Sequence, residues 1–341
     1  MSHSRITRHS LLFRLFQILA VATLGLCASF VQAQTCFTSN DMDQPTRTAL
    51  TNAGKRYFDM TARGDAASLR QNSIASVASD FSGIENAVKE NQANFSGVQP
   101  NLRSPFLLKA EGSAPLTKAE FLCGVFNANG QTSDSAEFVI PNLPPGNYAI
   151  VTLDLPTAKG PYTLSFVLQQ VANDWKLGGF YVNAAINGHD GKWFLEHARA
   201  FRDKGQKQNS WFYFIQARAL LSPVPFMYTQ ATDKLYDESQ SVKPTTLPVS
   251  GTTADLVADG KTYKLISVAP LAVGKDFDLL VRFQSADVSN TTQAFQDDMA
   301  VMKALLAKFP EFRDAFDGVV ARAVEPSGRD YGALLAMKDI K

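Results

Sequence analysis

The sequence predicts an α+β protein made of two units, each of which combines helices with mainly antiparallel strands. Three observations lead to this prediction. Helical periodicity dominates residues 45–95, and β-rich segments separated by Gly, Pro, Asn and Asp then fill residues 102–183. Helical periodicity returns over residues 191–238. Beyond a Ser-, Thr- and Pro-rich segment, strand and helix patterns alternate again to the end of the chain.

Residues 1–33 have the features of a secretory signal peptide. Three arginines precede an apolar run over residues 18–31, and Val31 and Ala33 supply small side chains at positions −3 and −1 of a cleavage site. The run has 14 residues, fewer than the ~20 that span a bilayer. We therefore expect cleavage after Ala33, a periplasmic or secreted protein, and no transmembrane anchor in the mature chain.

The expected mature chain, residues 34–341, has a nearly balanced charge. It carries 30 Lys and Arg against 32 Asp and Glu, a formal charge of −2, and no basic run remains. This argues against nucleic acid or an anionic membrane as a partner, so we expect an unknown small molecule or protein instead. Its 308 residues exceed what one core usually organises, which favours two domains.

Two cysteines, Cys36 and Cys123, remain after cleavage. In an exported protein a pair of cysteines forms a disulfide more often than a metal site. The bridge would close a long loop, worth about 4 kcal/mol in the chain-entropy model. It would also hold the predicted N-terminal tail, residues 34–44, against the sheet. Two free thiols are the alternative.

The first predicted helix covers residues 46–65 and closes at Gly64-Asp65. Its apolar residues recur at three- and four-residue steps: Leu50, Ala53, Tyr57 and Met60. Further helical segments continue to Phe95. The β-rich part then begins, and within it residues 161–170 alternate cleanly between two faces. Asn173-Asp174 predicts a hairpin turn into Trp175.

Helices followed by an antiparallel meander that ends in "DWKLGGFYV" resemble the NTF2-like superfamily. In this resemblance Asp174-Trp175-Lys176-Leu177 stands where the superfamily has its closing strand. The resemblance implies a cone-shaped α+β domain, which we assign to residues 45–188. Members include isomerases, dehydratases, transport factors and exported ligand-binding or assembly domains, so the resemblance does not select one function.

A cone of this kind would offer a pocket, and the sequence supplies aromatic side chains for its wall. The candidate pocket residues are Tyr162, Phe166, Trp175, Tyr181 and His189. Packing beneath the helices is the alternative use of the aromatic ones.

Residues 189–240 predict a helical hairpin. Phe194, Ala198 and Phe201 form one stripe, Gly205 breaks the helix, and the second helix is apolar around most of its circumference, which requires burial. The spacing of its small and aromatic residues is similar to that of one tetratricopeptide-type hairpin. A single copy of such a repeat is not stable alone, so we expect the hairpin to pack on the sheet.

Residues 241–256 predict a linker, and residues 257–341 a small ββαββ domain. Two strands are expected over 261–273 and 276–285, before a helix that Ser289 or Asn290 caps and Pro310 ends. A final hairpin turns across residues 326–330.

The remaining histidines, His189 and His197, lie close together in the sequence, and each has two interpretations. His189-Asp190 could be an acid–base pair on a loop. Asp190 is also a good N-cap for the following helix. For His197, one turn from Trp193, stacking or a side-chain hydrogen bond is expected. The spacing of "HDGKWFLEH" matches no zinc motif, and we expect neither a metal nor a cofactor.

Two functional hypotheses follow. No nucleophile motif is present, so the first assigns no catalytic residue. The first is an exported, non-enzymatic scaffold that binds a ligand or protein. The second is an NTF2-like isomerase or hydrolase that uses the cone pocket, with His189 as acid–base group.

Overall fold

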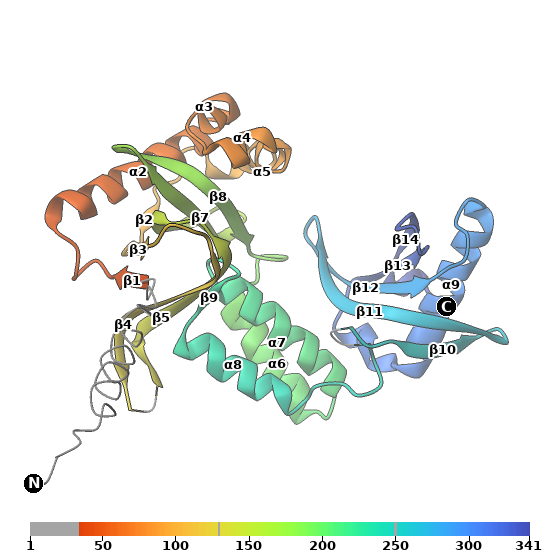
Figure 1. The fold of residues 1–341 in the computed structure, drawn as a ribbon. Coiled ribbons are helices and arrows are strands. Elements are labelled where there is room, and N and C mark those ends of the chain that lie inside the picture. The colour runs from red at the N-terminus through yellow and green to blue at the C-terminus, as the bar shows by residue number, and fades with distance from the viewer. Residues whose placement is uncertain (1–33, 129, 249–250) are drawn as a thin grey trace, which may run out of the picture.

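A computed structural model describes residues 34–128, 130–248 and 251–341 of the chain (Figure 1). The predicted signal peptide lies outside these residues. Helices and largely antiparallel sheets both occur in each half of the described chain, which confirms the α+β class. Figure 1 shows a set of helices above the first sheets, a helical hairpin below them, and a second sheet with its own helix beside the hairpin.

Four helices follow the first described strand, β1 (Gln34–Phe37): α2 (Gln44–Ala62), α3 (Ala66–Gln71), α4 (Ala75–Ser79) and α5 (Ser82–Phe95). Asp43 caps α2 by accepting a hydrogen bond from the Thr46 N–H at 2.8 Å. Gly64 follows α2 with a φ of 71°, and the next N–H, of Asp65, bonds back to the Met60 carbonyl. This left-handed residue ends the helix where the sequence predicts.

Two antiparallel sheets follow. The larger has the order β1-β3-β6-β7-β8, with β2 also paired to β6. Its strands are β1 (Gln34–Phe37), β2 (Asn101–Leu102), β3 (Phe106–Ala110), β6 (Gly146–Thr157), β7 (Gly160–Val171) and β8 (Asp174–Ala184). The smaller sheet has the order β4-β5-β9 and consists of β4 (Leu116–Asn127), β5 (Gly130–Leu143) and β9 (Met227–Tyr228).

The larger sheet is covered on both faces. Helices α2–α5 pack on one face, and the smaller sheet packs on the other. Strand β6 shows the consequence, since Val151 and Leu153 belong to the helix-side core while Tyr148 and Ile150 belong to the core between the sheets. A strand buried on both sides therefore reads as a continuous apolar run.

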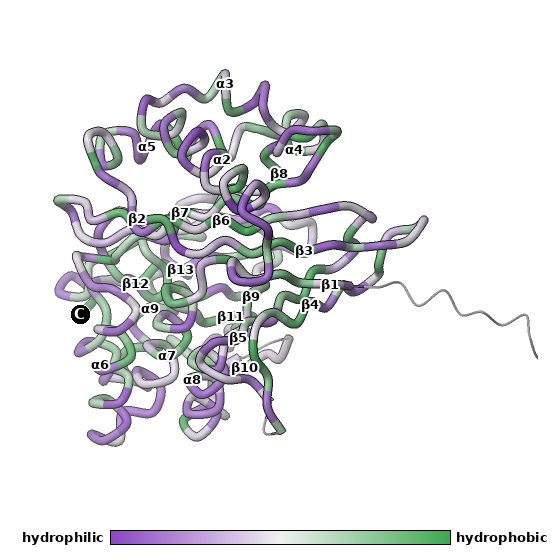
Figure 2. Tube along the Cα trace, turned by 90° about the vertical axis from the view of Figure 1, so that its left-hand side faces the viewer, coloured by the Kyte–Doolittle hydropathy of each residue, from purple (hydrophilic) through white to green (hydrophobic). Residues whose placement is uncertain are grey.

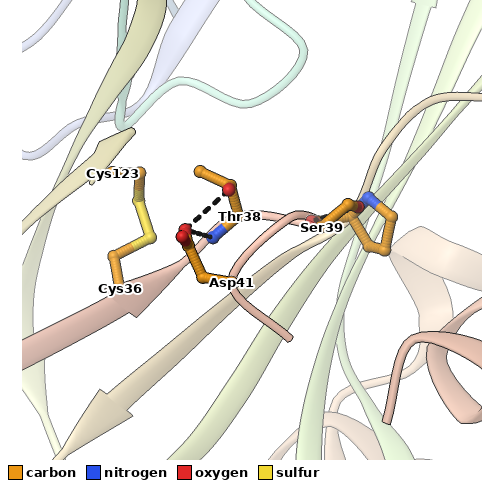
Figure 3. The surroundings of a disulfide bond; sticks show 6 residues. Cys36, Thr38, Ser39, Asp41 and Cys123 are labelled. Carbon is orange, nitrogen blue, oxygen red and sulfur yellow. Dashed lines mark hydrogen bonds between the residues drawn. A yellow bond between two sulfur atoms is a disulfide. The ribbon is translucent and has the colours of Figure 1, made fainter. Parts of the chain in front are cut away.

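The predicted disulfide between Cys36 and Cys123 is confirmed (Figure 3). It joins β1 to β4, with 5.1 Å between the two Cα atoms and a sequence separation of 87 between the cysteines. Cys36 also lies opposite Leu108 in the pairing of β1 with β3. The start of the described chain is thus held to one sheet by hydrogen bonds and to the other by a covalent bond.

The predicted hairpin consists of α6 (Gly191–Asp203) and α7 (Lys207–Leu221), and α8 (Gln230–Gln240) follows it. Gly191 allows α6 and α7 to approach closely, because a Cβ there would lie 2.7 Å from Leu221 Cγ. The buried residues of α6 and α7 share one hydrophobic cluster with the C-terminal residues. The hairpin contacts the larger sheet through Asn183, whose Nδ2 donates to the Ser222 carbonyl at 2.7 Å.

The C-terminal unit is a five-stranded sheet with the order β10-β11-β12-β13-β14. Its elements are β10 (Ala254–Ala258), β11 (Lys261–Val273), β12 (Asp276–Gln284), α9 (Thr291–Lys308), β13 (Gly318–Val324), β14 (Asp330–Ala336) and the 3-10 turns η1 (Pro310–Asp314) and η2 (Met337–Asp339). Strands β12 and β13 are parallel, and α9 makes the crossover between them. Asn290 caps α9, as one of the two predicted caps.

The prediction of two strands before α9 was wrong. Three precede it, because β10 begins inside the segment predicted as a linker and pairs antiparallel with β11. The Ser, Thr and Pro content of that segment predicts an exposed linker. Two of its residues, Val242 and Leu247, are instead buried in the same core as the hairpin. In Figure 2 hydrophobic stretches concentrate along the strands, while the outer turns of the helices are hydrophilic.

Candidate functional site

The loop that carries His189 is a tight turn between β8 and α6. Asn187 and Gly188 both have positive φ, 49° and 79°, as in type I′ turns that favour Asn-Gly. The N–H of His189 bonds to the Ile186 carbonyl at 2.9 Å, and the N–H of Ile186 returns a bond to the His189 carbonyl at 3.0 Å. The Asn-Gly pair before His189 therefore has a structural role, which is to form this turn.

Asp190 is the N-cap of α6, as one of its two interpretations predicts. Its Oδ1 accepts a hydrogen bond from the Trp193 N–H at 2.9 Å. The carboxylate is exposed and forms no hydrogen bond to His189 within the described chain. Asp190 therefore orients the helix and does not orient the imidazole.

Both histidines stack on the indole of Trp193. The ring centroid of His189 lies 3.7 Å from that of Trp193, and the centroid of His197 lies 3.6 Å from it. Two imidazoles this close to one centroid cannot share a face, so they cover opposite faces of the indole. His197 Nδ1 is also 2.9 Å from the Trp193 carbonyl. The expected stacking and hydrogen bond of His197 are both confirmed.

A small polar cavity of about 240 Å³ lies beside His189. Asp314 and Asp317 line it too, and both carboxylates already have partners: Gln206 Nε2 donates to Asp314 at 2.7 Å, and the Phe277 N–H donates to Asp317 at 2.8 Å. The Asp314 bond links the hairpin to the C-terminal unit, and the Asp317 bond lies within the C-terminal unit.

The structure does not bring the other predicted pocket residues to His189. Phe166 and Trp175 are buried in the core beneath α2–α5, where Phe166 contacts the ring of Tyr57 at 5.6 Å. Tyr162 is half-buried at the edge of that core, beside Phe95, and borders two depressions of mixed lining. Tyr181 points to the opposite side of the sheet and packs edge-on against Phe226.

Tyr181 borders a different depression, which we call the α7–α8 groove. It has a volume of about 590 Å³ and runs between the end of β8, helices α7 and α8, and the loop 222–227. Its wall is largely apolar and aromatic and includes Tyr181, Trp211, Phe214, Met227, Leu235 and Tyr236. A wider depression of about 780 Å³ beside α5 is lined mostly by polar side chains and lacks such a wall.

Arg218 of α7 projects into the wall of the α7–α8 groove. Its guanidinium lies over two rings, 5.6 Å from the centroid of Tyr228 and 5.3 Å from that of Tyr236. Nε of Arg218 is buried without a hydrogen-bond partner, and no carboxylate of the described residues lies within 4.0 Å of the guanidinium. Two tyrosines therefore hold a cation whose charge is not neutralised by an ion pair.

The charge of Arg218 acts on the carboxyl group of Asp233. Burial raises the pKa of the Asp233 carboxyl, and the charge of Arg218 opposes that rise. Asp233 Oδ2 accepts a hydrogen bond from Gln131 Nε2 at 3.0 Å and does not line the groove. The charged side chains that do line the groove are Arg218 and Lys243, both positive.

Sequence reasoning missed the groove because its parts are separated in the chain and are individually ordinary. A signal was present in α7, whose apolar surface predicts burial on nearly all sides. Arg218 interrupts that surface one turn before Ser222. An arginine among aromatic residues on an otherwise apolar helix is the pattern that could have pointed to it.

Among the described residues, no three His, Cys, Asp or Glu side chains are grouped in a way that could hold a metal ion. None of the described helices combines the length and the apolar character needed to cross a bilayer.

Comparison with known proteins finds no matching family model, no characterised protein similar in sequence and no solved structure similar in fold at a significant level. Function is therefore inferred from the residues of the site themselves.

Proposed function

We propose that this protein is exported and binds a small ligand in the α7–α8 groove without catalysing a reaction. The groove carries the proposal: its volume of about 590 Å³ falls in the range of roughly 300–1,000 Å³ that small-molecule sites occupy. Its apolar wall with few polar groups has the composition of such sites. The disulfide supports export, since such bonds persist in oxidising compartments.

The same proposal takes the N-terminal unit as an NTF2-like domain that serves as a scaffold. Helices α2–α5 on one face of an antiparallel sheet, with β6, β7 and β8 joined as consecutive hairpins, support this assignment. In this assignment the interior of the cone is packed, and Phe166 is one of its fully buried side chains. Ligand binding is assigned to the outside of the sheet, where β8 meets the hairpin.

An enzyme that uses His189 as an acid–base group is the second candidate. The observation in its favour is the polar cavity that His189 shares with Asp314 and Asp317. Against it, both carboxylates are engaged in structural hydrogen bonds, and Asp190 caps a helix. The two candidate functions place the bound molecule beside different tryptophans, Trp211 for the groove and Trp193 for the His189 cavity.

The three tryptophans of the chain separate the candidates experimentally. Trp211 lines the α7–α8 groove, Trp193 lies in the His189 cavity, and Trp175 is in the N-terminal core. The indole N–H signals of the mature chain can be followed by NMR while a small-molecule fragment library is added. We expect bound fragments to shift the Trp211 signal. Shifts confined to Trp193 would instead support the enzyme.

The obstructing variant is Ala219→Phe. Ala219 is an exposed residue of α7 that lines the groove, so a phenyl ring there fills space without entering the core. We expect fragments to bind this variant at least tenfold more weakly. Ala200→Phe is the matched control, since Ala200 is exposed on α6 away from the groove. Equal loss in both variants would contradict the proposed site.

A further inference from the structure

We infer that the ligand of the α7–α8 groove is a small amphipathic carboxylate, with its apolar body on the aromatic wall and its anionic group on Arg218. This inference rests on the proposed function and names the chemical class of its ligand. Three features of the groove carry it: the sign of its charges, the missing partner of Arg218, and the position of that side chain relative to the apolar wall.

The charges of the groove have one sign. Arg218 and Lys243 are the charged side chains that line it, and no carboxylate does. A cationic ligand would be repelled by both side chains, and a neutral apolar ligand would leave both without a counter-charge. An anion is favoured because a low-dielectric wall strengthens its attraction to the guanidinium.

Arg218 is pre-organised for such a group. The rings of Tyr228 and Tyr236 hold its guanidinium, while its buried Nε has no acceptor. The guanidinium also forms no ion pair with the described residues, so a carboxylate bound in the groove would supply its missing counter-charge. A guanidinium presents parallel N–H donors that match the two oxygens of a carboxylate. The two tyrosines already order the Arg218 side chain in the free protein, so less side-chain entropy is lost when a ligand binds.

The rest of the groove defines the apolar part of the ligand. Trp211 and Phe214 lie on α7 before Arg218, and Leu235 and Tyr236 face them from α8. Tyr236 is 48% exposed and Ile215, which also lines the groove, is 39% exposed. A ligand that covers these side chains would remove apolar surface from water, so both ends of an amphipathic molecule gain a partner.

The test compares three ligands with the same ten-carbon chain: decanoate, decan-1-ol and decylamine. Each is titrated into the mature chain by calorimetry at pH 7.5 and low salt, below its aggregation concentration, with the Trp211 indole signal as the reporter of location. We expect decanoate to bind at least tenfold more tightly than decan-1-ol, because its carboxylate can form a charge-assisted hydrogen bond with Arg218 and the hydroxyl of the alcohol cannot. We expect decylamine to bind most weakly.

The variant Arg218→Gln should reduce decanoate affinity to that of decan-1-ol and leave decan-1-ol binding unchanged. The control is Lys207→Gln, which removes one positive charge from the same helix outside the groove and should preserve the preference. If Arg218→Gln does not fold, the comparison of the three ligands in the wild type still tests whether the groove prefers a carboxylate.

The outcomes separate this inference from the proposed function. Equal affinity for decanoate and decan-1-ol at Trp211 would overturn the inference while leaving a groove that binds small apolar ligands. A preference for decanoate that survives Arg218→Gln would also overturn it. If none of the three ligands moves the Trp211 signal, both the inference and the groove as a ligand site fail.

Discussion

The N-terminal and C-terminal units bury polar side chains in different ways. In the N-terminal unit buried hydroxyl groups are paired: the hydroxyl of Tyr57 lies 2.8 Å from the carbonyl oxygens of Asn72 and Trp175, and the hydroxyls of Thr152 and Ser165 are 3.1 Å apart. In the C-terminal unit, by contrast, Asp298 of α9 is fully buried with no hydrogen-bond partner for either carboxylate oxygen among the described residues.

Burial has the expected effect on the buried acids of the C-terminal unit. It raises the pKa of Asp298 to about 7, although the nearby N–H groups of Ala333 and Ala323 and the charge of Arg322 oppose the rise. Burial also raises the pKa of Asp278 to about 6, reinforced by the charges of Asp276 and Asp317. The N-terminal unit thus depends on a redox-sensitive bond, and the C-terminal unit has pH-sensitive stability.

The largest expected effect is loss of the disulfide. The double variant Cys36→Ala, Cys123→Ala should lower the free energy of unfolding of the N-terminal unit by about 4.5 kcal/mol, because the bridge closes a loop of 87 residues. Hydrogen exchange should show lower protection in β3 and β6 and unchanged protection in β12 and β13. A parallel measurement on the wild type in dithiothreitol is the control. Equal loss in both units would show that they do not unfold separately.

Asp298→Asn tests the pH dependence of the C-terminal unit. Because the folded pKa of Asp298 is raised to about 7 from 3.8, the folded state keeps a proton that the unfolded chain has already released. This contribution is fully present below about pH 4 and is lost as the pH rises to about 7. Between pH 5 and 8.5 the wild type should lose about 3 kcal/mol more stability than the variant.

The measurement is the free energy of urea unfolding at several pH values, with exchange protection of β12 and β13 to identify the unit. Asp255→Asn, an exposed change on β10, is the control and should follow the wild type. If Asp298→Asn and the wild type have the same slope, Asp298 is ionised in the folded protein and has a partner.

The smallest effect concerns the boundary between the units. Asp190→Ala removes the N-cap of α6 and should cost about 1 kcal/mol. Since α6 shares its core with the C-terminal unit, the loss should appear in the exchange protection of that unit and not in β3 or β6. Asp190→Ser, which can still accept the Trp193 N–H, should retain most of the stability. Unchanged stability in Asp190→Ala would remove the capping role.

Much of the local structure could be predicted from residues alone. The first helix, the alternation of β7 and the cap at Asn290 each depend on neighbours within a few positions. The turn before Trp175 lies at Ala172–Asn173, one residue earlier than the predicted Asn173-Asp174, because Asp174 already pairs with Val171. The disulfide was predictable because the expected mature chain contains two cysteines. The predicted N-cap role of Asp190 also followed from local sequence.

The candidate site could not be predicted in this way. Phe166 and Tyr181 belong to neighbouring paired strands, and both looked suitable for a pocket wall. The two side chains point to opposite faces of one sheet, and only the packing of α2–α5 on one face shows which of them is covered. We predicted His189 in the same pocket because it follows β8 closely in the sequence. In the structure it stacks on Trp193, next to the C-terminal unit.

The sequence by itself determined the periodicity of each element, the caps, the turns and the covalent bridge, because each depends on local geometry or on the pairing of two cysteines. The tertiary structure alone decided which faces meet. It placed β4 and β5 in a separate sheet, paired β10 with β11, and docked the hairpin mainly on the C-terminal unit. The hydrophobic effect is non-directional. The apolar pattern of a helix therefore predicts that one face is buried, but it does not predict which element covers that face. The groove around Arg218 exists only where those choices bring α7, α8 and β8 together.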